Sequence, residues 1–265
     1  MIDHKPAKRF SIRVDDYVKY RPSYPTAVFD CLRDEFGLTD TAVIADIGSG
    51  TGLLSKLFLD NGNRVVGVEP NPEMRAAGEC FLAGYANFTS VNGTAEATTL
   101  PDDSVDFVTA GQAAHWFDAR PARREFERVL RGNGRIIFIW NNRDVDASPF
   151  MQEYEALLDE FSLKDSGYPP RKGGYERAPE VILGDNHIRR TFANRQSLDF
   201  AGLLGRSASS SMMPWPGHPQ YEPMAAALQK LFERYAVDGR VQILYKTSLR
   251  ISNVMRDAGK ITQYG

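Results

Sequence analysis

The sequence contains little cysteine and almost no net charge. Cysteine occurs only at Cys31 and Cys80 of 265 residues, without metal-ligand spacing, which argues against a disulfide framework and indicates a reducing compartment. Lysine and arginine number 32, against 34 aspartates and glutamates. The net charge of −2 gives no electrostatic basis for binding nucleic acid or an anionic membrane surface.

Long apolar runs are missing as well. The N-terminal stretch MIDHKPAKRF lacks the apolar core of a signal peptide, and no apolar run approaches the roughly 18 residues that span a bilayer. We therefore expect a cytoplasmic protein that is not embedded in a membrane. The sequence does not indicate the oligomeric state.

Several catalytic motifs are absent too. The four histidines are scattered and form no metal-binding constellation with the two cysteines, so we expect no metal site. The chain contains neither GxSxG, nor HExxH, nor the set of protein-kinase motifs. These absences argue against the hydrolase, metalloprotease and kinase classes that depend on those motifs.

What is present is a regular alternation of short β-rich runs and helix-like stretches between residues 41 and 142. Apolar and polar residues do not alternate strictly along these runs. Such runs are typical of parallel strands with helices on both faces. Asn71 is expected to cap one of the helices, with Pro72 at its first position. The β-rich runs are TAVIADIG, RVVGVE, FTSV, VDFVTA and RIIFIW.

Two later runs, HIRRTFANRQSL and VQILYKTSLRIS, are expected to pair at the end of the sheet. We predict an α/β fold with a doubly wound, mostly parallel seven-stranded sheet and helices on both faces. Residues 1–40 are expected to form a helical segment that covers the ligand site, and residues 41–265 the main domain. The stretches at about 164–180 and 205–220, rich in glycine and proline, are expected to be lid loops on the substrate side.

A glycine-rich turn, ADIGSGTG, joins the first strand to the first helix of this alternation. Its glycines let the backbone turn and let a ligand approach closely. Leu53 breaks the dinucleotide pattern GxGxxG, and no GK[ST] follows, so a phosphate loop is excluded. Glu69, at the end of the second strand, can accept both hydroxyls of a ribose, as in NAD and S-adenosylmethionine sites.

Five ordered motifs resemble the class I S-adenosylmethionine-dependent methyltransferases, in the branch that includes trans-aconitate methyltransferase-like enzymes. The resemblance covers roughly residues 40–142 and implies the Rossmann-like methyltransferase fold, with S-adenosyl-L-methionine as cofactor. A looser likeness, YVKYRPSYP, extends it toward the N-terminus. The motifs are DIGSGTG, VGVEPNPEM, VNGTAEATTLPDDSVDFVTAGQAAHWF (two motifs) and RVLRGNGRIIFIWN.

The resemblance also implies a role for each motif residue. Asp46 would orient the methionine ammonium, directly or through water, and Glu69 would bind the ribose diol. The methionyl and ribose portion would lie against the glycine turn and the residues after the fourth strand, which are Gly48, Ser49, Gly50, Gly52, Gln112 and Ala113. The adenine would lie beside Pro70, Met74, Ala95 and Glu96.

Two features leave alternatives open. Relatives often have aspartate where this chain has Thr94, so either Glu96 accepts from the adenine amino group or adenine selection is looser here. Tyr17 and Arg21 either close over the cofactor, where Arg21 would suit its carboxylate, or pack the N-terminal helix on the sheet.

Basic residues between Arg120 and Arg131 are interrupted by acidic ones, which indicates a solvated helix face.

The stretch GQAAHWFD places a histidine and two large aromatic residues where the fourth strand ends. His115 is either the general base for a protonated acceptor or a ring that shapes the pocket. Trp116 and Phe117 are expected to pack under the next helix, with one edge of Trp116 toward the substrate. Asp118 is expected to cap that helix.

We predict an S-adenosylmethionine-dependent methyltransferase that acts on a small molecule, with oxygen as the acceptor atom. Tyr168, Met213 and Trp215 are expected either to wall the substrate or to cap the core. Two other functions compete: a protein that binds S-adenosylmethionine without transferring its methyl group, and an NAD-dependent oxidoreductase.

Overall fold

The computed structural model describes residues 19–163, 177–210 and 212–253. The chain divides into two compact units, each built from segments that are separate in the sequence. We call them the sheet unit (Tyr24–Trp140, Arg171–Phe192 and Ser248–Gly265) and the helical unit (Met1–Ser23, Asn141–Pro170 and Ala193–Thr247).

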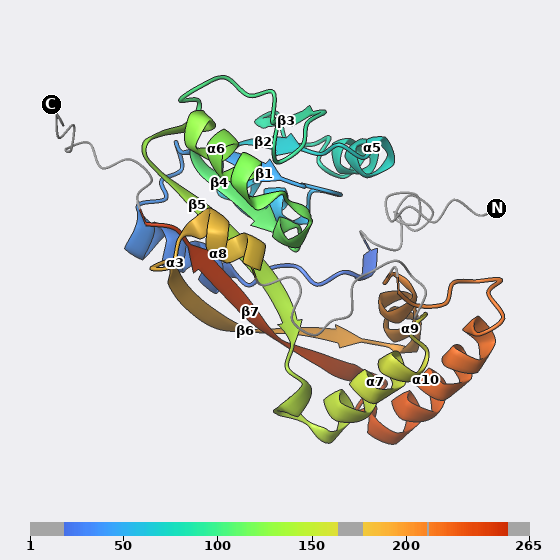
Figure 1. Ribbon diagram of the computed structural model, residues 1–265. Helices are drawn as coiled ribbons and strands as arrows, with labels where there is room; N and C mark the ends of the chain where they lie inside the picture. Colours follow the sequence, from blue (N-terminus) through green and yellow to red (C-terminus); the bar gives the residue numbers. More distant parts are fainter. Residues whose placement is uncertain (1–18, 164–176, 211, 254–265) are drawn as a thin grey trace, which may run out of the picture. The chain divides into compact units, whose positions relative to one another are not determined.

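Seven strands form one sheet in the order β3-β2-β1-β4-β5-β7-β6 (Figure 1). The pairs from β3 through to β5 are parallel. Strand β7 runs antiparallel to β5, because Ser252 bonds to Ile136 near one end of the pair while Leu244 bonds to Asp144 near the other. This confirms the predicted fold class. The strands are β1 (Val43–Ile47), β2 (Arg64–Val68), β3 (Phe88–Val91), β4 (Val105–Gly111), β5 (Leu130–Arg143), β6 (Ile188–Leu198) and β7 (Val241–Ile251).

Within the sheet unit, helices cover both faces of the sheet. On one face α3 (Thr26–Phe36) and α4 (Leu53–Leu59) pack on the strands through residues such as Leu32 and Phe58. On the other face α6 (Ala119–Val129) and α8 (Arg177–Leu183) contribute Phe126 and Ile182 to a second apolar cluster. Strands buried on both faces explain why their sequences are continuously apolar.

Helix α5 (Pro72–Phe81) begins as its sequence predicts. The side chain of Asn71 accepts a hydrogen bond from the Met74 N–H (2.9 Å), and Pro72 occupies the first turn, where its missing N–H is not needed. Gly78 lets this helix lie close to the glycine turn, since a Cβ there would stand 2.9 Å from the Gly50 carbonyl oxygen. The cap at Asn71 thus fixes where α5 begins, and Gly78 lets it pack against the loop that follows β1.

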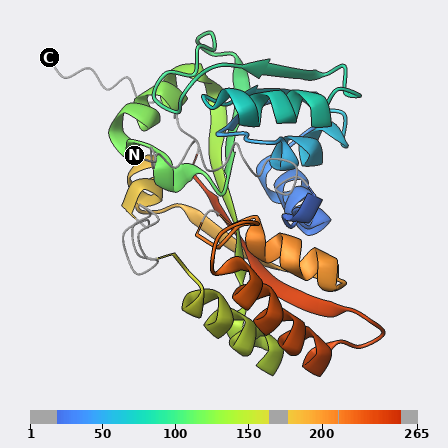
Figure 2. The ribbon, with the colours of Figure 1, turned by 90° about the vertical axis from the view of Figure 1, so that its right-hand side faces the viewer.

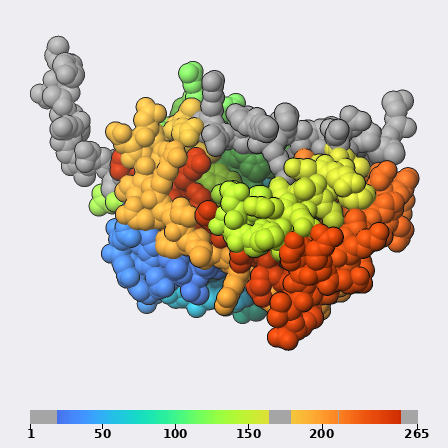
Figure 3. Space-filling model, turned by 90° about the horizontal axis from the view of Figure 1, so that it is seen from below, coloured from blue at the N-terminus to red at the C-terminus, as the bar shows by residue number. Residues whose placement is uncertain are grey.

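The helical unit contains α7 (Pro149–Glu160), α9 (Phe200–Ala208) and α10 (Tyr221–Tyr235) (Figure 2). Side-chain caps start two of these helices: Ser148 accepts from the Met151 N–H and Asp199 from the Gly202 N–H. Helices α7 and α10 lie side by side, as the yellow-green and red-orange segments of Figure 3 show, and share one apolar cluster.

The units divide the chain differently from the predicted segments. One boundary falls between Ser23 and Tyr24 rather than at residue 40. Parts of the two stretches predicted as lid loops are helical: residues 177–180 begin α8 and residues 205–208 end α9. Helix α8 buries Ile182 in one apolar cluster, and α9 buries Leu203 in another. This burial stabilises both helices although the surrounding sequence is rich in glycine and proline. Their role as lids stays a prediction.

Among the residues that the structure describes, no helix combines the length and the apolar character needed to cross a membrane.

Candidate functional site

The glycine turn leaves β1 and enters α4 at the carboxyl end of the parallel strands. Gly48, Gly50 and Gly52 all have positive φ (65°, 56° and 83°), a conformation that favours glycine. At Gly48 space is also short, because a Cβ would stand 2.8 Å from the Cβ of Ala113. The turn therefore packs against the loop after β4 and presents backbone without side chains.

Glu69 fixes this turn from the end of β2. Its Oε2 accepts from the Gly50 N–H and its Oε1 from the Asn71 N–H, both at 2.9 Å. The residue is 8% exposed, and burial raises the pKa of its carboxyl while the two N–H donors oppose the rise. Each oxygen keeps a further lone pair, so the carboxylate can also accept from two hydroxyl groups.

Asp46, the last polar residue of β1, lies beneath the turn. It is fully buried, and its two oxygens accept from the Ser55 hydroxyl (2.7 Å) and the Thr109 hydroxyl (3.4 Å). Burial raises the pKa of this carboxyl to about 7, although both hydroxyl groups act against the rise. Asp46 therefore ties β1 to α4 and β4, and its contact with a methionine ammonium stays a prediction.

Two further observations show that the turn fits S-adenosylmethionine. The hydroxyl of Thr51 is buried, yet it has no hydrogen-bond partner among the described residues, so a donor is left unused inside the turn. Met74 of α5 lies directly over the turn, since a Cβ on Gly50 would stand 3.3 Å from its methyl group. The turn thus has the methyl group of Met74 over Gly50 and, at Thr51, a buried hydroxyl group without a partner among the described residues.

The loop after β3 carries the residues predicted to meet the adenine. Ala95 is buried in the core, and the backbones of Thr94 and Ala97 pair as a short bridge. Glu96 points to a different partner, because its Oε1 accepts from the Asp118 N–H at 2.8 Å. Asp118 is the N-cap residue of α6, but its side chain makes no capping hydrogen bond. The predicted N-cap position of Asp118 is confirmed, although its side chain does not bond to the first turn.

Glu125 anchors the same loop, a role that the sequence did not reveal. Its Oε1 accepts from the N–H (2.8 Å) and the hydroxyl (2.6 Å) of Thr98, and both of its oxygens pair with Arg128. The Arg128 pair and the Thr98 donors lower the pKa of Glu125 to about 2. In the sequence, the mixed charges between Arg120 and Arg131 indicated only a solvated helix face. No local pattern shows that Glu125 accepts hydrogen bonds from Thr98, which lies 27 residues away.

The loop after β4 lies beside the glycine turn. Gln112 holds a left-handed conformation (φ 59°), and its N–H donates to the Ile139 carbonyl at 2.9 Å. A short 3-10 helix, η1 (Ala114–Trp116), follows and carries His115. Burial lowers the pKa of His115 to about 4, so its ring is neutral at pH 7.

The two aromatic residues of this loop differ in their surroundings. Phe117 packs edge-on against Phe126 and Phe138, as predicted for a residue under the next helix. Trp116 is 46% exposed, with its ring 5.0 Å from that of His115. The prediction that Trp116 is mainly packed is wrong, because η1 turns its ring outward.

The remaining predicted residues do not belong to the described part of the sheet unit. Tyr17 and Tyr168 lie outside the described residues. In the helical unit, Arg21 donates to the Ser209 carbonyl (3.2 Å), and Met213 is buried in the unit's apolar cluster. Trp215, in the same unit, is 37% exposed with its ring 4.8 Å from that of His218.

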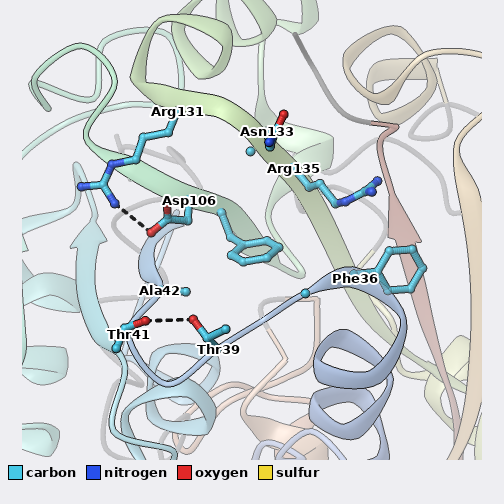
Figure 4. A pocket seen from close by; sticks show the side chains of 11 residues that line it. Phe36, Thr39, Thr41, Ala42, Asp106, Arg131, Asn133 and Arg135 are labelled. Carbon is cyan, nitrogen blue, oxygen red and sulfur yellow. Dashed lines mark hydrogen bonds and ion pairs between the residues drawn. The ribbon is translucent and has the colours of Figure 1, made fainter. Parts of the chain in front are cut away.

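A cavity of about 870 Å³ lies at the other end of the sheet unit's strands (Figure 4). Its wall includes residues that precede β1, such as Thr41, and residues at the start of β4 and β5, such as Asp106 and Arg135. Asp106 is paired there with Arg131 at 2.9 Å. The cavity is therefore separate from the glycine turn. No group of three or more His, Cys, Asp or Glu within the described ranges could hold a metal ion.

Comparisons with known proteins identify the family of this chain. A family model described as a methyltransferase domain matches residues 45–138. An uncharacterized methyltransferase of Schizosaccharomyces pombe is 32% identical over 178 residues, which are 67% of each chain. A second protein of that yeast, named as uncharacterized methyltransferase-like, is 32% identical over 61% of this chain and 62% of its own.

A solved structure agrees in fold. The structure of a putative type II methyltransferase from Anaeromyxobacter dehalogenans superposes with a TM-score of 0.65 at 20% identity, covering 90% of this chain and 100% of that one. The alignments with the two yeast relatives span only about two thirds of their length. The glycine turn, Glu69 and the loop after β4 all fall within the segment that the family model matches.

Proposed function

The chain belongs to the class I S-adenosylmethionine-dependent methyltransferases, and from this premise we propose that it transfers a methyl group to an oxygen atom of a small-molecule acceptor. Family membership argues against the NAD-dependent alternative, as does Leu53 in the glycine turn. Bound S-adenosylmethionine would supply a methyl group already activated by its positive sulfur. The protein's own tasks are then to position the acceptor and to exclude water.

The observation that carries the proposal is that Glu69 can bind the glycine turn and a ribose at the same time. Its carboxylate holds Gly50 and Asn71 through their N–H groups and keeps lone pairs for two ribose hydroxyls. In this proposal the methionyl and ribose portion lies along the turn, over Asp46 and Thr51. Met74 and Ala95 face the adenine, with Pro70, Thr94 and Glu96 at its edge. Gln112 and Ala113 lie near the reacting methyl group.

The acceptor would lie beside the loop that carries His115. A neutral ring at pH 7 can accept a hydrogen bond from a hydroxyl group and so orient its oxygen. A pKa of about 4 makes it a weak base, so the ring would serve positioning more than proton removal. An acceptor that is already anionic, such as a carboxylate, would need no base.

Calorimetric titration of the full chain with S-adenosylmethionine, S-adenosylhomocysteine and NAD, in parallel, tests the cofactor. Micromolar binding of the first two without NAD supports the proposal, and binding of NAD alone contradicts it. Release of S-adenosylhomocysteine, measured over a panel of phenols, alcohols and carboxylic acids, then tests transfer. Tight cofactor binding with no turnover on the panel would favour a binding protein without transfer activity.

A further inference from the structure

The side chain of Tyr24 lies against the carboxyl end of β4. A Cβ on Gly111, the last residue of that strand, would overlap the Tyr24 hydroxyl oxygen and would stand 3.2 Å from Cδ2 of Leu54. The φ of Gly111 is not positive, so this glycine provides space rather than an unusual backbone conformation. The missing side chain of Gly111 thus lets the Tyr24 hydroxyl group reach the end of β4.

The residues around Tyr24 hold it in this position. Pro25 follows it directly, and a residue before proline favours an extended backbone. Helix α3 then begins at Thr26, and the half-buried ring of Tyr24 packs on the apolar cluster beneath α3 and α4. Tyr24 and Gly111 both belong to the sheet unit, so their contact lies within one unit.

The Tyr24 hydroxyl group lies on the same face of the sheet as the carboxylate of Asp46. Asp46 accepts from the hydroxyl of Thr109 on β4 at 3.4 Å, and Gly111 is two residues farther along that strand. Residues two apart in a strand face the same side. The Ser55 and Thr109 hydroxyls already bond to Asp46. This face therefore carries a carboxylate and, one step nearer the end of β4, a phenolic hydroxyl group.

We propose that the Tyr24 hydroxyl donates a hydrogen bond to the methionine carboxylate of S-adenosylmethionine. This inference rests on the proposed function, in which Asp46 orients the ammonium of the same methionine. Two residues of a strand span about 6.6 Å, which leaves room for an ammonium and a carboxylate on one carbon atom, with a hydrogen bond at each end. A hydrogen bond from a phenol to a carboxylate is stronger than one between neutral groups, because its acceptor is charged.

Arg21 is the rival donor for this carboxylate, since the sequence suggested it for that role. It belongs to the helical unit, where its Nη2 donates to the Ser209 carbonyl at 3.2 Å. Tyr24 instead lies in the sheet unit, beside the strand that leads to Gln112 and Ala113. The two assignments differ in which variant loses affinity for the carboxylate.

Calorimetric titration of the full chain measures whether the hydroxyl group recognises the carboxylate. Two ligands are compared: S-adenosylmethionine, and decarboxylated S-adenosylmethionine, which keeps the ammonium but has no carboxylate. Tyr24→Phe should weaken binding of S-adenosylmethionine by roughly 10- to 100-fold and leave binding of the decarboxylated ligand within about twofold. Tyr85→Phe is the matched control, because Tyr85 packs on the same apolar cluster and its hydroxyl bonds to Asp60. It should bind both ligands as the wild type does.

Gly111→Ala provides a second variant that keeps the hydroxyl group but displaces it. The added Cβ would occupy the position of the Tyr24 hydroxyl oxygen, so we expect the same loss for S-adenosylmethionine and little change for the decarboxylated ligand. Neither variant needs a known acceptor, because the readout is binding. Thermal unfolding without ligand checks the fold, and Tyr24→Phe should melt near the wild-type temperature because it keeps the ring.

The remaining outcomes separate this inference from the proposed function. If the wild type does not bind S-adenosylmethionine, the proposed function fails and this inference fails with it. If the wild type binds but Tyr24→Phe weakens both ligands equally, or neither, Tyr24 only packs the end of β4 and this inference alone is overturned. A loss confined to S-adenosylmethionine in Arg21→Gln, with none in Tyr24→Phe, assigns the carboxylate to Arg21 and likewise overturns it.

Discussion

The carboxylate of Glu69 accepts a hydrogen bond from the backbone N–H of Gly50 at 2.9 Å, so the end of β2 holds the turn that follows β1. The two residues are 19 positions apart in the sequence. Because Gly50 has positive φ and no side chain, the turn depends on this bond and on the neighbouring backbone contacts for its shape. One carboxylate therefore serves both the conformation of the turn and the proposed ribose contact.

Glu69→Gln should weaken S-adenosylmethionine binding by roughly 10- to 100-fold, or about 1–3 kcal/mol, because an amide NH₂ would face one of the two N–H donors. Calorimetry gives the affinity, and thermal unfolding reports any loss of the turn. Glu73→Gln, at an exposed residue in the first turn of α5, is the matched control and should bind as the wild type does. Equal affinities for the two variants would remove Glu69 from the ribose site.

Asp46→Asn should alter how stability depends on pH. The folded-state pKa of Asp46 is raised to about 7 from 3.8, so the native state binds more protons than the unfolded state between these values. The contribution is fully favourable below about pH 4 and is lost as pH rises toward 7, by an amount on the order of a few kcal/mol. In the Asp46→Asn variant this decline should be absent. Urea unfolding at pH 4 to 8 measures it, and parallel curves for both proteins would contradict the raised pKa.

His115 should remain neutral well below its usual titration range. Nuclear magnetic resonance of the ring nitrogens should show no protonation between pH 7.5 and 5.5, since burial lowers the pKa to about 4. His115→Gln should keep S-adenosylmethionine affinity within about twofold and lower kcat by roughly tenfold, without moving the pH profile, as expected for a positioning group. His187→Gln, elsewhere in the sheet unit, is the control. A ring that titrates near pH 6.5 would restore the general-base hypothesis.

Glu125→Gln should raise the Kd of S-adenosylmethionine by roughly 3- to 10-fold, with little change in the acceptor's KM. Glu125 holds the loop after β3 through Thr98, and losing a charged acceptor costs about 1.5–3 kcal/mol, of which only part reaches the ligand. Glu127→Gln, on the same helix, weakens a partly exposed ion pair with Arg123 that is remote from Thr98, and serves as the control. If both variants bind the cofactor equally, the loop does not depend on Glu125.

Much of the sheet unit could be predicted from the sequence because its signals are local. Asn71 and Pro72 start α5, and the three glycines of the turn adopt the positive φ that only glycine accepts easily. The five β-rich runs became five parallel strands, and the inner ones are apolar because both of their faces are buried. Each of these features depends on residues that are close together in the chain.

What could not be predicted depends on contacts between distant segments. Glu96 reaches Asp118 and Glu125 reaches Thr98 across more than 20 residues, so neither partner is visible in a local pattern. The exposed position of Trp116 follows from the 3-10 turn of η1, for which the sequence carries no clear signal. Arg206 sits in a stretch rich in glycine and serine, where only the tertiary packing of α9 shows that it is buried.

The division of the chain into interleaved segments has a consequence for its dissection. Residues 41–142 carry the recognisable motifs, yet the sheet unit also includes residues 177–192 and 248–253 among those that the structure describes. A fragment of residues 41–142 would lack Ile182 and Leu183 over one face of the sheet and Leu249 and Ile251 over the other. The segment that carries the family motifs is thus not a domain that can fold independently. Expressed alone, it would present an uncovered apolar surface and an unpaired strand edge, and we expect it to aggregate.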